Sequence, residues 1–460
     1  RSSVSSEAAA DKQARLCRLP LRSRPSYEEP SLFDDPKILP TSLIEPHFEN
    51  RVIFFMTLPK QVASAPQSRP PLSLVSPRRI TALQIGIGWF PETPGGLDCV
   101  YYNLARHLPE QGVDVVGLVA GSEKVIQDSQ GRVASFARHD DNWKSRLRAL
   151  RRYATEELNS GRVDLIASHF GLYSLPLLDH LRKRPFVFHF HGPWAFECEA
   201  EGGDFLATRS RWLVEKAVYR NADRFVVLSD AFANLLETRY GVARDRIDIV
   251  PGGVADSFFK ASASMEEARQ ALSLPMDRPI LLTVRRLCRR MGLESLIDAI
   301  AEVRRQAPDV LLLIGGKGPI EADLKRRIEE RGLERHIRML GFIPDADLPL
   351  YYRAADLSVV PTVALEGFGL VAAESLAAGC PALVTPVGGL PSVVAELSPG
   401  LVLSDATAEA LADSLTGALK GTLKLPSRAA CRRYALDRFQ WSLVAERTER
   451  VYRKVLGGRS

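Results

Sequence analysis

The sequence contains no long hydrophobic run, no closely spaced cysteine pair and no leader-like opening. Apolar stretches such as VIFFM from residue 52 and VLLLI from residue 310 have the length of a strand. They fall well short of the roughly 20 residues that span a bilayer. No basic segment followed by an apolar one opens the chain, so a secretory signal is not expected. The sequence therefore predicts a cytoplasmic protein that does not span a membrane.

The cysteines also lack the spacing of a metal site or a disulfide framework. Six cysteines are scattered without a C-x-x-C pair: Cys17, Cys99, Cys198, Cys288, Cys380 and Cys431. This pattern favours free thiols in a reducing compartment. The sequence likewise contains no RNP-like aromatic motif and no zinc-finger spacing, so no nucleic-acid partner is expected.

Length and composition are those of a globular protein with two domains. The chain has 460 residues, of which 45% are hydrophobic and 25% are charged, with a formal net charge of +6. Ordinary surface arginines explain such a bias. Attraction to phosphate-bearing partners, such as nucleotide sugars or anionic lipid, is the alternative.

The pattern along the chain changes near residue 79. Residues 1–78 are rich in serine, proline and charge and have no regular period, which predicts a disordered extension. In 79–253 and again in 254–440, short apolar runs alternate with amphipathic stretches, and Pro251-Gly-Gly reads as the linker between them. This alternation predicts an α/β fold of two facing, Rossmann-like, doubly wound domains with a cleft between them.

Unusual residues follow the predicted strands, where parallel sheets bind ligands. His191-Gly-Pro-Trp follows FVFHF, Arg285 and Arg286 follow ILLTV, and Gly315-Gly-Lys-Gly-Pro follows VLLLI. His189 and His191 lie two residues apart on one strand and so share a face. We expect His189 to be a packed or hydrogen-bonded core residue and His191 to be the one facing the cleft.

The strongest local pattern is PTVALEGFGLVAAESLAAGCP, residues 361–381. Glu366 and Glu374 have seven residues between them, and two glycines in the EGFG stretch argue against one continuous helix. The sequence predicts Glu366 in a loop and a helix that begins near Leu370 and ends at Gly379. The positive end of that helix suits a diphosphate or sugar hydroxyls. Glu366 is placed to accept hydrogen bonds from a sugar, and Glu374 from a ribose; the alternative is a pair of solvated glutamates.

Two weaker patterns concern glycines and aspartates. Gly95 and Gly96 let backbone N–H groups approach a ligand, or form only a tight turn. GIGWFP resembles a dinucleotide fingerprint, but Pro91 replaces the third glycine, which argues against a nicotinamide cofactor. Asp345-Ala-Asp347 resembles a metal-binding pair, but it precedes a helix where an aspartate cap is expected. No metal and no cofactor are therefore predicted.

Taken together, these motifs resemble those of the retaining glycosyltransferase family 4, the group 1 glycosyl transferases of the GT-B fold. The resemblance spans about residues 80–456 and rests on PETPGG, HFHGPW, RRLCRRMG, GGKGP, LGFIPDADLPLYYRAAD and the Glu366–Glu374 segment. It implies metal-independent transfer of a sugar from a nucleoside-diphosphate sugar, with retained anomeric configuration. The expected setting is polysaccharide or glycoconjugate biosynthesis. It also implies that a helix over 441–460 crosses back to the first domain.

The resemblance assigns roles to particular residues. His191 and Glu366 are the catalytic candidates, and both would lie at the donor sugar. Glu374 would bind the ribose and Arg286 the diphosphate. The remaining donor-binding candidates are Gly95, Gly96, Arg290, Gly316, Phe342, Gly367, Phe368, Gly369 and Leu370.

Two departures from the family pattern leave other functions open. Met291 stands where the family usually has lysine, so Arg290 would have to supply that charge, and Lys317 replaces a usual aspartate. The alternatives are a sugar-nucleotide epimerase or hydrolase, a phosphorylase, and a non-catalytic sugar-nucleotide-binding protein.

The sequence does not identify the acceptor, and a sugar, a lipid-linked molecule or another small molecule is expected. The basic stretch KSRLRALRRY (144–153) belongs either to a solvated helix or to a peripheral contact with anionic lipid.

Overall fold

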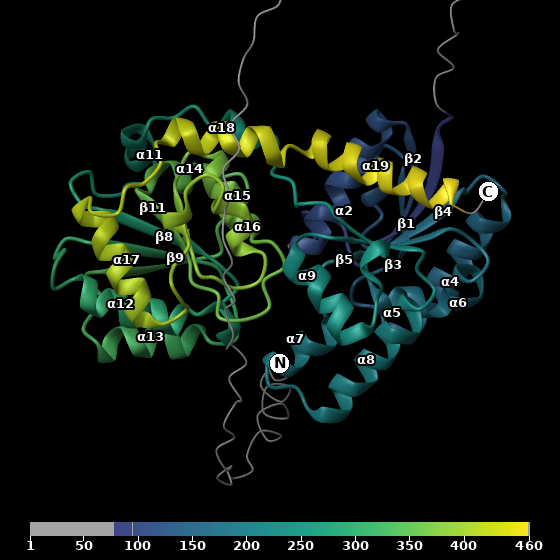
Figure 1. Ribbon diagram of the computed structural model, residues 1–460, viewed down its shortest axis with the longest axis horizontal. Coiled ribbons are helices and arrows are strands. Elements are labelled where there is room, and N and C mark those ends of the chain that lie inside the picture. The colour runs from purple at the N-terminus through teal and green to yellow at the C-terminus, as the bar shows by residue number, and fades with distance from the viewer. Residues whose placement is uncertain (1–77, 94, 459–460) are drawn as a thin grey trace, which may run out of the picture. The chain divides into compact units, whose positions relative to one another are not determined.

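The computed structural model describes residues 78–93 and 95–458, which belong to one compact unit containing two parallel sheets (Figure 1). The extension predicted for 1–78 lies outside the described residues, apart from Arg78. We call the two parts built on these sheets the first-sheet domain and the second-sheet domain.

The first sheet has seven parallel strands in the order β3-β2-β1-β4-β5-β6-β7. Its strands are β1 (Ile80–Ile85), β2 (Val113–Ala120), β3 (Val133–Ala137), β4 (Leu165–Ser168), β5 (Phe186–Phe190), β6 (Arg224–Val227) and β7 (Ile247–Ile249). The helices between them are α2 (Gly96–His107), α3 (Val125–Asp128), α4 (Trp143–Asn159), α5 (Gly171–Ser174), α6 (Leu178–Leu181), α7 (Trp194–Ala200), α8 (Phe205–Tyr219) and α9 (Asp230–Leu235).

The second sheet has five parallel strands in the order β10-β9-β8-β11-β12. Its strands are β8 (Ile280–Val284), β9 (Leu311–Gly315), β10 (Ile337–Gly341), β11 (Leu357–Val360) and β12 (Ala382–Val384). The accompanying helices are α10 (Asp256–Lys260), α11 (Met265–Ala271), α12 (Leu293–Val303), α13 (Glu321–Glu330), α14 (Leu348–Ala354), α15 (Leu370–Ala377), α16 (Leu390–Val394), α17 (Ala408–Lys420) and α18 (Arg428–Phe439).

Each sheet reverses its strand order next to its first strand in the sequence, between β1 and β4 in the first sheet and between β8 and β11 in the second. The first grows outward from β1 through β2 and β3 on one side and from β4 on the other, and the second does the same from β8 and β11. In doubly wound sheets, the loops that follow the two central strands diverge at such a point and leave room for a ligand. The segments after β1, β4, β8 and β11 are therefore where a site is expected.

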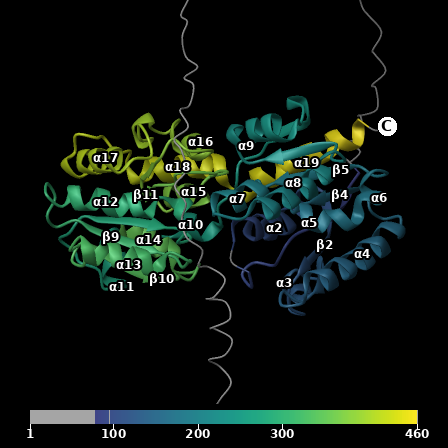
Figure 2. The ribbon, with the colours of Figure 1, turned by 90° about the horizontal axis from the view of Figure 1, so that it is seen from below.

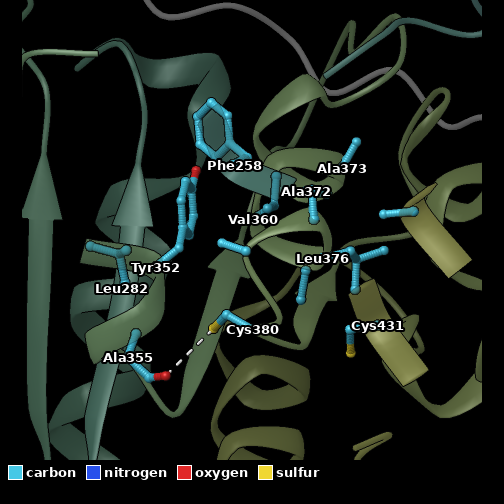
Figure 3. Packing of buried hydrophobic residues seen from close by; sticks show 14 of the residues in the cluster. Phe258, Leu282, Tyr352, Ala355, Val360, Ala372, Ala373, Leu376, Cys380 and Cys431 are labelled. Atoms are coloured by element: carbon cyan, nitrogen blue, oxygen red, sulfur yellow. Dashed lines mark hydrogen bonds between the residues drawn. The ribbon is translucent and has the colours of Figure 1, made fainter. Parts of the chain in front are cut away.

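Both faces of each sheet are covered, because consecutive strand residues point to opposite sides. In β8, Leu281 packs with α12, α13 and α17, whereas Leu282 packs with α14, α15 and α18. Figure 3 shows this second cluster, in which Ala372, Ala373 and Leu376 of α15 lie among Val360, Tyr352 and Phe258. Small alanine side chains let α15 lie close to β11, which fixes the position of the helix start.

The last helix of the described chain, α19 (Trp441–Gly457), belongs by its contacts to the first-sheet domain. It contacts α2, β5 and β6, and Figures 1 and 2 both show it on the first-sheet domain. Gly253 permits this path, since a Cβ there would lie only 2.5 Å from the Trp441 ring. Trp441, Val444, Tyr452 and Val455 are buried against the sheet.

The prediction of two doubly wound α/β domains is confirmed. The short strand β3, at the edge of the first sheet, was not predicted. No described helix has the length and apolarity required to pass through a bilayer.

Candidate functional site

The loop between β11 and α15 has the form that the sequence predicts. Gly369 is the N-cap of α15 with φ of 90°, a conformation that glycine adopts without strain, and the helix begins at Leu370. Gly388 and Gly389 pack against the backbone of this loop, and the Gly389 N–H donates to the Glu366 carbonyl at 2.9 Å. A Cβ at Gly388 would lie 1.9 Å from that carbonyl oxygen, so only glycine fits there. The position of Glu366 is thus fixed by backbone contacts.

Arg285, the first residue after β8, is the direct partner of Glu366. Its Nη2 forms an ion pair and a hydrogen bond with Glu366 Oε2, and it contacts Thr362 Oγ1 and Met291 Sδ, each at 2.7 Å. Burial alone would raise the pKa of Glu366, but the charge and hydrogen bond of Arg285, with Arg290 and Thr362, lower it below its ordinary value. Glu366 is therefore ionised and held in one orientation.

Arg286 and Arg290 lie beside this pair and face acidic residues of the first-sheet domain. Arg290 Nε and Arg286 Nη1 lie 3.5 and 3.6 Å from Glu201 Oε1, and Arg290 Nη2 lies 3.8 Å from Glu197 Oε1. Arg290 also donates to the Leu365 carbonyl at 3.2 Å, which joins it to the Glu366 loop. Two guanidinium groups thus meet carboxylates where a diphosphate was expected.

Glu374 lies within α15, one turn beyond its start, and its side chain makes no hydrogen bond with another described residue. Burial, and then the charge of Asp345, raise its pKa to about 7. The carboxylate of Asp345 also acts with Glu374 on Cys99 of α2, whose pKa is raised chiefly by burial. Near pH 7 the Glu374 carboxyl group is therefore partly ionised, and its oxygens can accept hydrogen bonds.

Two further candidates of the second-sheet domain have different surroundings. Gly316 has φ of 131°, and a Cβ there would lie 1.8 Å from the Arg285 carbonyl oxygen, so glycine lets the loops after β8 and β9 touch. Phe342 is an exposed aromatic residue after β10. Gly316 therefore allows the close backbone contact beside Arg285, whereas the aromatic ring of Phe342 is exposed to solvent.

On the side of the first sheet, the glycine turn before α2 reaches the start of α15. Gly95 is the N-cap of α2, and a Cβ at Gly96 would contact Leu370 at 3.7 Å. Asp98 in the first turn accepts from the Gly88 N–H at 2.9 Å, which ties the loop after β1 to the helix. A Cβ at Gly367 would lie 2.5 Å from Phe232, so the EGFG loop also rests against α9. The two predicted glycine turns thus lie close together.

His191 is part of a stack of three imidazoles. The His169 ring is nearly parallel to those of His189 and His191, with centroid distances of 4.3 and 5.1 Å. His189 is buried and hydrogen-bonded to Tyr452, as expected for a core histidine. Burial lowers the pKa of His191 to about 4, so the ring is neutral at ordinary pH.

The loop after His191 is fixed by a buried carboxyl group that the sequence did not reveal. Glu215 of α8 accepts from the Trp194 and Ala195 N–H groups at 2.8 and 3.3 Å, and from the Tyr240 hydroxyl at 2.7 Å. Burial raises its pKa to about 7, although these hydrogen bonds oppose the rise. Glu215 caps the helix that carries Glu197.

The structure therefore brings Glu366, Arg290, Gly96 and Leu370 together and places Arg286 at the edge of the group. Three contributions were missed: the direct role of Arg285, the glutamates of α7 and its end, and the partners of His191. Arg285 was visible as the residue nearest the strand end. Glu197 and Glu201 gave no signal, since each resembles an ordinary surface glutamate of a short helix.

The aspartates of the D-x-D pattern separate. Asp347 is the N-cap of α14, as expected from position, although its side chain makes no capping hydrogen bond. Asp345 lies near Glu374 instead, and its pKa is raised by burial. Among the described residues, no group of three or more His, Cys, Asp or Glu side chains is arranged to hold a metal ion.

Comparison with known protein families covers both domains. A model described as Glycosyltransferase Family 4 matches residues 94–258, and one described as Glycosyl transferases group 1 matches residues 264–438. These ranges contain the Gly95–Gly96 turn, His191, and the Glu366–Glu374 segment.

Individual relatives agree with these matches. D-inositol 3-phosphate glycosyltransferase of Corynebacterium aurimucosum is 30% identical over 396 residues, which cover 78% of this chain and 90% of the relative. The enzyme of that name from Corynebacterium urealyticum is 34% identical over 266 residues, or 55% of this chain and 62% of the relative. The fold is similar to that of HepE from Anabaena, solved with UDP and glucose: the TM-score is 0.65 at 19% identity, covering 82% of this chain and 100% of HepE.

Proposed function

The chain belongs to glycosyltransferase family 4, the group 1 glycosyl transferases, and on that premise we propose that it is a retaining enzyme that uses a nucleoside-diphosphate sugar. The transfer needs no metal ion in this proposal. The observation that carries it is the Glu366 loop, which opens α15 beside the Arg285, Arg286 and Arg290 side chains.

The donor binds along the start of α15. The free N–H groups of that helix and the guanidinium groups of Arg286 and Arg290 supply the positive charge that a diphosphate requires. Glu374 accepts hydrogen bonds from the ribose hydroxyls, since its carboxyl group has no partner of its own among the described residues. Glu366, ionised and fixed by Arg285, accepts from the sugar hydroxyls. The backbone of Gly367 to Leu370 supports the sugar and the phosphate.

Catalysis follows from where charge develops. As the glycosidic bond breaks, negative charge grows on the leaving diphosphate, and fixed guanidinium donors stabilise that charge more in the transition state than in the ground state. His191 is neutral and lies at the end of β5, on the side of the acceptor, where it meets the sugar near the reacting carbon. The acceptor hydroxyl attacks from the face that the diphosphate leaves and gives its proton to the departing diphosphate oxygen, which retains the anomeric configuration.

The acceptor is a small polyol that carries a phosphate. Support comes from the relatives, whose names specify D-inositol 3-phosphate. UDP is the first donor nucleotide to test, because HepE was solved with it.

A lipid-linked acceptor is the second candidate, and α4 is the feature that favours it. This helix exposes Trp143, 53% accessible, next to a basic face with Lys144, Arg148 and Arg152. An aromatic residue beside basic ones suits a surface of anionic lipid. Co-sedimentation with phosphatidylserine vesicles at low salt is the expected result in that case, and its absence there removes the lipid-linked acceptor.

The test is a transfer assay with purified protein. UDP-, GDP- and ADP-sugars are offered with inositol phosphate, with and without excess EDTA, and the anomeric configuration of the product is read by NMR. We expect one donor to give a product with retained configuration, and EDTA to leave the rate unchanged. Nucleotide release without transfer would favour a hydrolase or epimerase, and binding without turnover would favour a sensor. Complete loss of activity in EDTA would return the Asp345 and Asp347 pair to consideration as metal ligands.

A further inference from the structure

The imidazole stack continues into the core of the first-sheet domain through two buried polar side chains. Gln84 lies in β1 and Tyr452 lies in α19; both are fully buried, and His169 and His189 are 2% exposed. Four segments of the chain thus contribute polar groups to one buried cluster: β1, the residue after β4, β5 with the residue that follows it, and α19. Buried polar groups of this kind are costly unless each is hydrogen-bonded.

The hydrogen bonds form one continuous chain. His191 Nε2 lies 2.9 Å from His169 Nδ1, and His169 Nε2 lies 3.2 Å from Gln84 Oε1. Gln84 Nε2 donates to the Tyr452 hydroxyl at 3.1 Å, and that hydroxyl lies 2.9 Å from His189 Nε2. Each contact needs one donor and one acceptor, so the proton positions are linked along the whole chain.

The orientation of the Gln84 amide determines which atom is the donor in each of these hydrogen bonds. With Oε1 of this amide facing His169, that oxygen can only accept, so in this orientation His169 carries its proton on Nε2 and offers Nδ1 as an acceptor. His191 must then donate from Nε2, which leaves its Nδ1 without a proton. At the other end, the same orientation has Tyr452 accept from Gln84 and so donate to His189. Burial lowers the pKa of His169 and His189 well below the ordinary value, so these two rings, like that of His191, are neutral.

We propose that Gln84 is a positioning residue: together with His169 and Tyr452 it holds His191 in the Nε2–H tautomer, so that Nδ1 serves as a hydrogen-bond acceptor. This rests on the proposed role of His191 at the donor sugar. An acceptor nitrogen there receives a hydrogen bond from a sugar hydroxyl. The opposite tautomer presents an N–H to the same hydroxyl and cannot accept from it. The orientation of one buried amide thus decides what His191 does for the substrate.

The proposal is tested without relying on turnover, by imidazole ¹⁵N NMR of the full chain labelled at its eight histidines. Protonated and unprotonated nitrogens of a neutral imidazole resonate far apart, and the His191 signals are those lost in His191→Gln. We expect the proton of His191 on Nε2 alone. In Gln84→Met, which keeps the side-chain length but removes both hydrogen bonds, we expect a mixture of the two tautomers. Tyr452→Phe removes one hydroxyl only and is expected to give the same mixture.

Tyr352→Phe is the matched control, because it also removes a buried tyrosine hydroxyl, one without a hydrogen-bond partner in the second-sheet domain. It is expected to leave the His191 signals as in the wild type. In the transfer assay, an even mixture of tautomers lowers the competent fraction, and therefore kcat, by about twofold in Gln84→Met.

A proton on Nδ1 of wild-type His191, a charged ring, or an unchanged single tautomer in both Gln84→Met and Tyr452→Phe would overturn the proposal. A protein with the expected tautomer shifts but no transferase activity would instead count against the proposed function alone.

Discussion

The two domains hold their candidate residues in different ways. In the second-sheet domain, Arg285 and Glu366 form a buried ion pair whose partners lie in two loops beside the sheet. In the first-sheet domain, His191 is held by neutral hydrogen bonds and ring stacking that continue through the core to Tyr452. Both groups are proposed to meet sugar hydroxyls, but Glu366 is oriented by a charged partner and His191 by neutral ones. The difference predicts different responses to substitution and to pH.

The largest effect on stability is expected at Arg285. Arg285→Met leaves the Glu366 carboxylate, which is 15% exposed, without its partner, and breaking such a pair costs up to about 3–5 kcal/mol. Arg286→Met, at a side chain that is 60% exposed with a loose ion pair, should change stability by less than about 1 kcal/mol. Urea unfolding of both variants measures the contrast. Equal losses would mean that the two arginines are not distinguished by burial.

The largest effect on activity is expected at Glu366. Glu366→Gln keeps the shape but removes the charge that Arg285 orients, and we expect a fall in kcat of about 10²–10³-fold. Glu396→Gln, at an exposed glutamate paired with Arg438 in the same domain, is the control and should retain the wild-type rate. The circular dichroism spectra of both variants show whether the fold is intact. A near-normal rate in Glu366→Gln would remove that residue from the site.

The pH dependence of donor binding should come from the second-sheet domain. The pKa of Glu374 is raised to about 7, so its carboxylate is mostly present at pH 8 and mostly protonated at pH 6. We expect the nucleotide Kd to rise about tenfold between pH 8 and pH 6, as the ionised fraction falls. The diphosphate also titrates near pH 6, so the part due to Glu374 is the difference from Glu374→Gln by calorimetry. Identical slopes in the two proteins would count against the ribose contact.

The first-sheet domain should show its pH dependence in stability instead. The pKa values of His169, His189 and His191 are lowered by burial, so the unfolded chain takes up protons below about pH 6.5 while the folded chain does not. Their contribution is complete above that pH and is lost on acidification, at up to about 1.4 kcal/mol per pH unit for each ring. Glu215 and Glu374 act in the opposite direction, because their raised pKa values favour the folded state in acid.

The histidine contribution is therefore read as a difference between two proteins. His169→Gln removes one of the three rings, and its melting temperature should fall less between pH 6.5 and 4.5 than that of the wild type. Calorimetry at several pH values measures both curves. Parallel curves would show that the stack does not govern the response to acid.

The smallest effect is expected where the two domains meet. Glu201 lies 3.5 Å from Arg290 and so competes with a diphosphate for the same guanidinium. Glu201→Gln should lower the donor Kd by up to about fivefold, which is the size of one exposed ion pair. Glu199→Gln, at an exposed residue of α7 two positions before Glu201, should leave the donor Kd unchanged. Weaker donor binding in Glu201→Gln would indicate that Glu201 itself contacts the donor.

The comparison also shows which parts the sequence reveals. The EGFG loop, the helix start at Leu370 and the arginines after β8 are each contained in a short stretch, so local rules for caps and strand ends predict them. The chain around His191 joins residues 84, 169, 189, 191 and 452, and only the pair on β5 is visible as a pattern. Gln84 reads as one polar residue in an apolar strand, and nothing local says what lies beside it.

The arginine assignment illustrates the same limit. Arg285 and Arg286 are adjacent, and a side chain in an extended segment points to the side opposite that of its neighbour. Which of the two faces Glu366 depends on the register with the loop after β11, which the sequence pattern leaves open. Burial then decides: Arg285 is enclosed with Thr362 and Met291, whereas Arg286 is exposed at the edge.

The path of α19 bears on how such proteins can be recombined. The first-sheet domain is discontinuous, because Tyr452 completes its central cluster from a point in the chain that follows the whole second sheet. A foreign donor domain that is joined to this chain only near Pro251 would therefore also replace Tyr452. Gln84 and His189 would then lose their hydrogen-bond partner. A chimera that keeps the native acceptor side needs a second crossover close to Gln440, so that the native final helix is retained.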